Sequence, residues 1–310
     1  MFKWINNFIN NIKRDRAYKK RIKELRKRDP FIYKWYSMNY VGISCGFHDA
    51  ALSVIDDNGN ILFAGHSERY SMKKHDSELC YGIVDDAKNH INDDFEVHYY
   101  ERPYVKAVRQ FFAKQELGPF NVEKIIGQFN LRMMDSVKHI RQGKVKTHNH
   151  HLCHAAAGFQ TSPFEDATVV VIDAIGEFDT ISIWNAWYDK NGKAQYKKLW
   201  GQKYPDSIGL FYSAMTERVG LRPLDEEYIL MGMAAYGKTT HLDEMSSELV
   251  ESYRDIIFRD NLHTGVSKDF LEDADSMDIA TATQLIAEQL IENVISKARS
   301  LGGSKNLVYG

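Results

Sequence analysis

One pattern of strand, loop, strand and turn occurs twice in this 310-residue chain. In each copy an apolar strand is followed by a small polar loop, a second apolar strand and an Asn-Gly turn that leads to a third strand. The copies begin at Val41 and Thr168, and their turns contain Asn58-Gly59 and Asn191-Gly192. Asn-Gly between apolar runs predicts a hairpin, because both residues tolerate positive φ. A repeat of this size indicates two similar half-molecules.

The loop between the first two strands of each copy is rich in small residues. It contains Gly46 in the first copy and Gly176 in the second. Backbone N–H groups in such loops suit phosphate oxygens, since little side chain lies in the way. Two such loops that meet across a cleft would hold a nucleotide. The repeat therefore predicts an α/β fold with the duplicated plan of the actin-like ATPases (the ASKHA fold).

The same patterns predict the division of the chain. We expect a basic amphipathic extension over residues 1–38, a first actin-like half over 39–163 and a second half over 164–310. Helices are expected over residues 79–91, 104–117, 208–219 and 279–301, and a last strand over 306–309. Because the helix and loop that should follow this strand are not in the sequence, we expect an incomplete second half. Residues 285–310 would then form an exposed apolar edge.

Charge is distributed unevenly along the chain. Residues 1–30 carry a net charge of +8, and the remainder therefore carries −10 to give the overall −2. Apolar residues of the extension share one helical face: Trp4, Ile5, Phe8, Ile9 and Ile12. Such a helix is expected to dock on its own protein or on a partner, with a membrane surface or nucleic acid as the alternative. The acidic remainder does not favour a nucleic-acid surface.

Several protein classes are excluded by what the sequence lacks. It has no apolar run of about 18 residues and no signal sequence, so neither a membrane span nor secretion is expected. Three scattered cysteines favour a reducing compartment, and we expect a cytoplasmic protein. A GK[ST] phosphate loop, a GxSxG elbow and a CxxC pair are also missing.

A histidine cluster over residues 148–154 (HNHHLCH) is the densest set of metal-ligating side chains. On a helix, His150 and His154 lie one turn apart and could both bind one divalent metal ion, as could His151 and His154. The alternative is a helix start whose histidines bond backbone carbonyls. Asp173 follows an apolar strand, where a carboxylate would point into a cleft or cap a loop.

His48 is the other candidate for chemistry, because it lies in the first small-residue loop. A histidine there could bond a phosphate or act as a general base. The alternative is that His48 and Asp49 are an ordinary polar pair of a loop.

Longer segments occur in a fixed order along the chain. They are residues 46–51 (GFHDAA), 67–76 (SERYSMKKHD), 150–156 (HHLCHAA), 171–177 (VIDAIGE), 207–217 (SIGLFYSAMTE) and 227–237 (EYILMGMAAYG). Together they resemble the O-carbamoyltransferase family that decorates nodulation factors and antibiotics. The resemblance implies an actin-like large domain that moves a carbamoyl group from carbamoyl-adenylate to a hydroxyl of an acceptor. A C-terminal YrdC-like domain makes that adenylate from carbamoyl phosphate and ATP.

The resemblance also implies roles for individual residues. Fe²⁺, or another divalent metal, would be held by His150, His154 and Asp173, and His48 would be catalytic. Contacts to ATP or carbamoyl-adenylate would come from Gly46, Asp49, Arg69, Lys74, Gly176, Glu177 and Thr180.

The chain departs from the family pattern at several points. Ala174 replaces a glycine after the strand aspartate, and Ile229 replaces a lysine. The family's adenosine-binding segment, a later metal-binding aspartate and the YrdC-like domain would all follow Gly310. We therefore expect a chain that is inactive alone and needs a C-terminal partner polypeptide. The alternatives are a non-catalytic nucleotide- or metal-binding remnant and an unrelated metal hydrolase.

Overall fold

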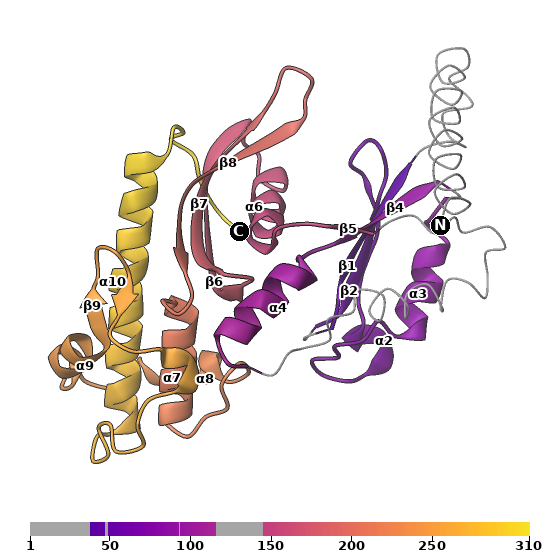
Figure 1. The fold of residues 1–310 in the computed structure, drawn as a ribbon. Coiled ribbons are helices and arrows are strands. Elements are labelled where there is room, and N and C mark those ends of the chain that lie inside the picture. The colour runs from indigo at the N-terminus through magenta and orange to yellow at the C-terminus, as the bar shows by residue number, and fades with distance from the viewer. Residues whose placement is uncertain (1–37, 47–48, 93, 116–144) are drawn as a thin grey trace, which may run out of the picture. The chain divides into compact units, whose positions relative to one another are not determined.

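The computed structural model describes residues 38–46, 49–92, 94–115 and 145–310 (Figure 1). The predicted basic extension and His48 therefore lie outside the described residues. Contacts divide the chain into two compact units, each of which is described by itself. Among the described residues, the first unit holds those up to Tyr100 together with 145–147. The second holds Glu101 to Gln115 and His148–Gly310.

The first unit is built on a five-stranded sheet with the order β3-β2-β1-β4-β5. Its strands are β1 (Asn39–Ser44), β2 (Ala51–Ile55), β3 (Ile61–His66), β4 (Phe95–Tyr99) and β5 (Lys146–Thr147). Strand β1 pairs antiparallel with β2 and parallel with β4. Helices α2 (Glu68–Ser71) and α3 (Tyr81–Lys88) follow β3, and α3 buries Ile83, Val84 and Ala87 in the core under the sheet.

The second unit repeats this plan on a sheet with the order β11-β6-β7-β8. Its strands are β6 (Asp166–Gly176), β7 (Asp179–Tyr188), β8 (Ala194–Lys203) and β11 (Leu307–Tyr309). Strand β6 pairs antiparallel with β7 and parallel with β11, as β1 does with β2 and β4. Four strands of each sheet thus share one order and one set of directions, and β5 extends the first sheet beyond them. The predicted α/β class and duplicated actin-like fold are confirmed.

The repeated turns have one physical cause. Asp56 Oδ1 accepts hydrogen bonds from the backbone N–H groups of Asn58 and Asn60, at 2.8 and 2.9 Å. Asp189 Oδ1 accepts from Asn191 and Lys193, at 2.8 and 3.0 Å. The glycine of each turn adopts positive φ, +83° in the first and +72° in the second. The aspartate fixes the turn and the glycine supplies the backbone conformation.

Strands β6 and β7 are buried on both faces, which explains their continuous apolar runs. On one face, Val170, Ile181 and Ile183 belong to a core with α7 (Ile208–Arg218) and α10 (Ser276–Leu301). On the other face, Val169, Val171 and Trp184 pack with α6 (His150–Gln160). Figure 1 shows α6 and the pair α7 and α10 on opposite sides of this sheet.

The remaining described elements complete the second unit. They are α4 (Pro103–Phe112), α8 (Glu227–Met233), α9 (Leu242–Leu249), the short strands β9 (Val250–Ser252) and β10 (Ile257–Phe258) and a 3₁₀ turn (Leu262–Thr264).

Four predicted helices are confirmed as α3, α4, α7 and α10. Contacts group α4 and α6 with the second unit, whereas the sequence-based division put them in the first half. No described helix has the length and apolar content needed to cross a membrane.

The predicted exposed apolar edge over residues 285–310 is wrong for the helix. Ile286, Leu290 and Val294 of α10 are fully buried, because this face packs against helices that the chain itself supplies. Exposed large apolar side chains in this range are limited to Leu301, Leu307 and Tyr309 among the described residues.

Leu290→Ala should lower the free energy of unfolding by about 2–5 kcal/mol, because it leaves a cavity in the core beneath β6. The neighbouring exposed residue offers a matched control, and Gln289→Ala should change stability by less than about 0.5 kcal/mol. Denaturant titration measures both values. Equal midpoints for the two variants would contradict the described packing of α10.

Candidate functional site

Helix α6 places the histidine cluster at its first turns. Its N-cap is Asn149, whose side-chain oxygen accepts a hydrogen bond from the backbone N–H of Leu152 at 2.9 Å. This interaction satisfies one of the backbone donors that a helix start leaves unpaired. The capped start fixes the direction in which His150, His151 and His154 leave the helix.

Asp173 reaches the cluster because strand β6 bulges. Its pairing with β7 stops at Ile172 and resumes at Gly176, so the residues between leave the ladder. The start of α7 holds the bulge: Ser207 Oγ donates to the Ala174 carbonyl at 2.8 Å. A Cβ on Gly209 would lie 2.8 Å from Ala174 Cα, so glycine permits this close approach.

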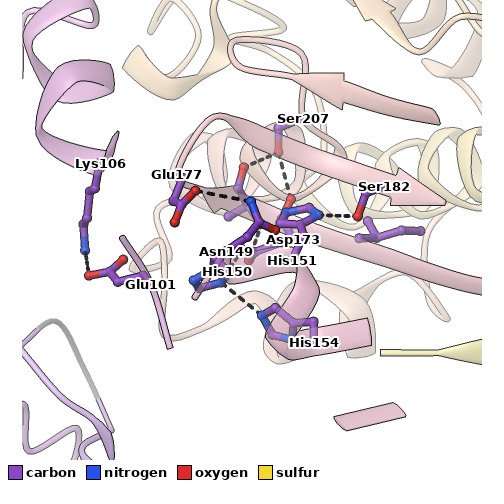
Figure 2. Close-up of polar contacts among 12 residues, drawn as sticks. Glu101, Lys106, Asn149, His150, His151, His154, Asp173, Glu177, Ser182 and Ser207 are labelled. Atoms are coloured by element: carbon purple, nitrogen blue, oxygen red, sulfur yellow. Dashed lines mark hydrogen bonds and ion pairs between the residues drawn. The ribbon is translucent and has the colours of Figure 1, made fainter. Parts of the chain in front are cut away.

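Three ligand atoms meet at this point, as Figure 2 shows for the facing imidazoles of His150 and His154. The Nε2 atoms of His150 and His154 are 3.0 Å apart, and His150 Nε2 is 3.0 Å from Asp173 Oδ2. One ligand atom from each residue lies within 4.8 Å of the others. The structure therefore brings together the three residues that the sequence analysis named as metal ligands.

Hydrogen bonds alone do not account well for the close approach of these three ligand atoms. If His150 Nε2 carries a hydrogen, that single hydrogen must serve both the carboxylate oxygen and the second imidazole nitrogen. If it carries a lone pair, that lone pair faces a carboxylate oxygen, and the two repel. A divalent cation accepts a lone pair from all three atoms at once. The donor set therefore fits a metal ion.

Burial and neighbouring charges shift the pKa values of the cluster. Burial lowers the pKa of His154, and the nearby His150 lowers it further. For Asp173, burial acts to raise the pKa, but the hydrogen bond and charge of His150 outweigh it and leave the pKa lowered. These shifts favour a neutral His154 imidazole and an ionised Asp173 carboxylate, which are the states of the two groups that bind metal.

His151 is turned away from this group and into the core. Its side chain is fully buried, and Nδ1 lies 2.7 Å from Ser182 Oγ. Burial lowers the pKa of His151 to about 4, so its imidazole is neutral. Of the two histidine pairs that the spacing allowed, His150 with His154 is therefore the pair that converges. Burial likewise raises the pKa of the neighbouring Cys153 thiol to about 11, which leaves it unreactive at neutral pH.

The loop after β6 is packed directly on the histidines. A Cβ on Gly176 would lie 2.6 Å from His150 Cδ2 and 2.4 Å from His151 Cδ2. Glu177 has a φ of +62°, and its buried carboxylate accepts from the Arg102 backbone N–H at 2.7 Å and from the Arg102 guanidinium. Thr180 donates its hydroxyl hydrogen to the Asp206 carbonyl. The side chains of Glu177 and Thr180 thus hold the loop itself.

The other predicted nucleotide contacts lie in the first unit. Gly46 has a φ of +92° and donates its backbone N–H to the Ser77 carbonyl at 2.8 Å. Asp49 lies at the start of β2, Arg69 is an exposed residue of α2, and Lys74 is exposed in the segment after it. His48 lies outside the described residues, and its predicted role stays a prediction.

A family model described as "Carbamoyltransferase N-terminus" matches residues 78–293, which is more than half of the chain. The chain belongs to the carbamoyltransferase family. Among curated proteins it is similar to the uncharacterised protein sll1178 of Synechocystis sp., with 28% identity over 81% of this chain and 46% of that protein. Nodulation protein NolNO of Sinorhizobium fredii is 23% identical over 84% of this chain and 40% of its own length. The chain thus spans less than half the length of these relatives.

Two solved structures match the chain with low TM-scores. One is the activator of the 2-hydroxyisocaproyl-CoA dehydratase from Clostridium difficile with bound ADPNP, with a TM-score of 0.39, 11% identity and coverage of 88% of this chain and 79% of that one. The other is the PPX-GPPA enzyme of Aquifex aeolicus, with a TM-score of 0.32, 13% identity and coverage of 88% and 96%.

In this carbamoyltransferase family member, sequence reasoning missed the residues that support the site. Asn149 could have been found, because an Asn before a helical pattern is a typical N-cap. Arg102, Arg109 and Ser182 carried no local signal. Arg109 is buried and donates from Nε to the Glu177 carbonyl at 3.1 Å, so it supports the loop from a distant helix.

Ser182→Ala should destabilise the protein by about 1–3 kcal/mol for each buried group that it leaves unpaired. The Ser182 hydroxyl is bonded by Trp184 Nε1, at 2.7 Å, and by His151 Nδ1. Thermal unfolding measures the loss. Ser247→Ala removes an exposed hydroxyl that donates to the Glu244 carbonyl, and its transition should stay close to that of the parent chain. A Ser182→Ala variant as stable as this control would contradict the pairing.

Proposed function

We propose that the chain is the N-terminal part of an O-carbamoyltransferase, and that it transfers a carbamoyl group from carbamoyl-adenylate to a hydroxyl of an acceptor. The observation that supports the proposal most directly is the convergence of His150, His154 and Asp173 in a member of the carbamoyltransferase family. The cytoplasm is the compartment that we propose for this reaction, since its substrates derive from ATP.

The metal that we propose for this site is Fe²⁺. Two imidazoles and one carboxylate are the donor set of many non-haem iron sites. Both separations at His150 Nε2 are 3.0 Å, so His150, His154 and Asp173 lie close enough together to hold one ion. A bound divalent cation acts as a Lewis acid on a carbonyl or phosphoryl oxygen.

The chain's own residues would bind and orient the substrates. We assign His48 to the acceptor hydroxyl, as a general base or as a hydrogen-bond donor to the carbamoyl carbonyl. Gly46, Asp49, Arg69 and Lys74 are proposed to contact the nucleotide from the first unit. In the second unit, the Glu177 carboxylate and the Thr180 hydroxyl are bonded within the protein. The loop from Gly176 to Thr180 would therefore meet phosphate through its backbone.

The proposal includes a second catalytic part. The chain spans 46% of one curated relative and 40% of another, and a YrdC-like part is expected to make the carbamoyl-adenylate from carbamoyl phosphate and ATP. We propose that this part acts together with residues 1–310, and that the later metal-binding aspartate of the family completes the metal site. Both parts would then be needed for turnover.

His154→Ala should weaken Fe²⁺ binding at least about 10-fold. Losing even a residue that only hydrogen-bonds a metal ligand typically lowers metal affinity about 10–100-fold, and His154 is proposed as a ligand itself. Anaerobic calorimetry on the 310-residue chain measures the change. His241→Ala is the matched control, since its Nδ1 pairs with Glu244 at 3.2 Å far along the chain from the cluster. We expect weak binding even by the parent chain, because one ligand is expected from outside it. Tight binding that His154→Ala leaves unchanged would refute the site.

His48→Ala should reduce carbamoyl transfer about 10²–10⁴-fold, the usual contribution of general acid–base catalysis. The assay uses the chain co-expressed with its YrdC-like part, carbamoyl phosphate, ATP and a hydroxyl acceptor. His90→Ala, an exposed histidine of the same unit, should retain activity. Unchanged turnover in the His48 variant would remove its catalytic role, and full turnover by the 310-residue chain alone would refute the need for a second part.

A further inference from the structure

A second group of metal-ligating side chains lies within the first unit, on elements that the His150 site does not use. Asp49 precedes β2, His66 ends β3 and Glu68 begins α2. One ligand atom from each lies within 4.8 Å of the other two. We propose that Asp49, His66 and Glu68 form a second site for a divalent cation, with His75 beside it. The inference does not depend on carbamoyl transfer.

The scaffold of the first unit fixes these three residues relative to one another. His66 is the register partner of Ala51 in the antiparallel pair β2 and β3, which brings it beside the start of β2. The Ser67 N–H donates to the Ala50 carbonyl at 2.7 Å, and the Ala50 N–H donates to the Asp76 carbonyl at 2.7 Å. Residues that flank the ligands are thus joined by backbone bonds, which limits how far the ligands can move apart.

The distances suit a shared ion. Asp49 Oδ1 lies 3.8 Å from His66 Nε2 and 3.3 Å from His75 Nδ1. Two ligands about 2.1 Å from a tetrahedral metal are about 3.4 Å apart. Glu68 Oε2 accepts from the His75 backbone N–H at 3.3 Å, so one carboxylate oxygen joins α2 to the segment that carries His75.

The charge of the group and its mixture of nitrogen and oxygen donors favour a divalent cation that accepts both kinds of ligand. Asp49 and Glu68 bring two carboxylates to the group, and a divalent ion would neutralise both. The nearby Lys73 Nζ pairs instead with Asp76, at 3.8 Å. Imidazole nitrogen with carboxylate oxygen suits Zn²⁺ or Mn²⁺, whereas Mg²⁺ prefers oxygen and water. Side chains of Asp49 and His66 are 36% and 37% exposed, which leaves room for water to complete the coordination.

A site here would also explain why an aspartate lies in a loop that suits phosphate. A carboxylate and a phosphate repel each other, and Asp49 is three residues after Gly46. A cation held by Asp49 removes the repulsion and adds an attraction.

The test is a Zn²⁺ titration of the 310-residue chain in which His150 and His154 are both replaced by Ala. This double variant removes the site in the second unit, so we expect one equivalent of Zn²⁺ to remain bound. Adding His66→Ala should weaken that binding at least about 10-fold. Adding the near-isosteric Asp49→Asn should do the same while the thermal transition stays close to that of the double variant. Co²⁺ absorption should show the same loss.

Adding His241→Ala instead should leave the stoichiometry and affinity unchanged. No Zn²⁺ binding by the double variant would overturn the proposal. So would binding that persists at the same affinity after both His66→Ala and Asp49→Asn, because the ion would then be held elsewhere. Neither result bears on Fe²⁺ binding by His150 and His154 in the parent chain, so this site and the proposed function fail separately.

Discussion

The close contact between the loop after β6 and the start of α6 is the constraint on which the second unit's site depends. A Cβ at Gly176 would penetrate the rings of both His150 and His151, so only glycine lets the strand and the helix approach this closely. The approach buries His151 against Ser182 and turns His150 toward Asp173. The missing side chain therefore permits the close packing in which His151 faces the core and His150 faces the carboxylate.

The bulge in β6 is the second feature on which the site depends, because it lets Asp173 leave the β-ladder and reach His150. A regular strand would alternate its side chains across the sheet and keep pairing with β7, whereas here pairing lapses between Ile172 and Gly176. Ser207 and Gly209 at the start of α7 hold the displaced segment. The segments VIDAIGE and SIGLFYSAMTE are thus coupled physically: one forms the bulge and the other secures it. Gly209 permits this packing, because a Cβ there would lie 2.8 Å from Ala174 Cα.

Local patterns predicted the fold well and the support of the site poorly. The two Asn-Gly turns and the runs of apolar residues are short-range signals, and they led to turns and strands that the structure contains. The one-turn spacing of His150 and His154 is also a short-range signal, and the two side chains converge, while their role as metal ligands stays a prediction. The burial of α10 was mispredicted. Its apolar face is covered by helices α7, α8 and α9, and contacts between residues so far apart in the sequence leave no local pattern. Arg102 and Glu177 are 75 residues apart, and no local pattern reports such a pair.

The duplication explains why ligand sets arise in both units and why they differ. In each copy a serine is the N-cap of the helix that follows the third strand, and it bonds back to a residue shortly before the second strand. The Ser67 N–H donates to the Ala50 carbonyl, and the Ser207 hydroxyl donates to the Ala174 carbonyl. The first copy adds His66 and Glu68 on either side of its serine, so its candidate ligands come from one hairpin and the helix that follows. The second copy has Asp206 and Ile208 there, and Asp206 instead bonds the Phe258 N–H at 2.9 Å. Its candidate ligands come from α6 and the β6 bulge, so the two units carry candidate ligand groups of different composition.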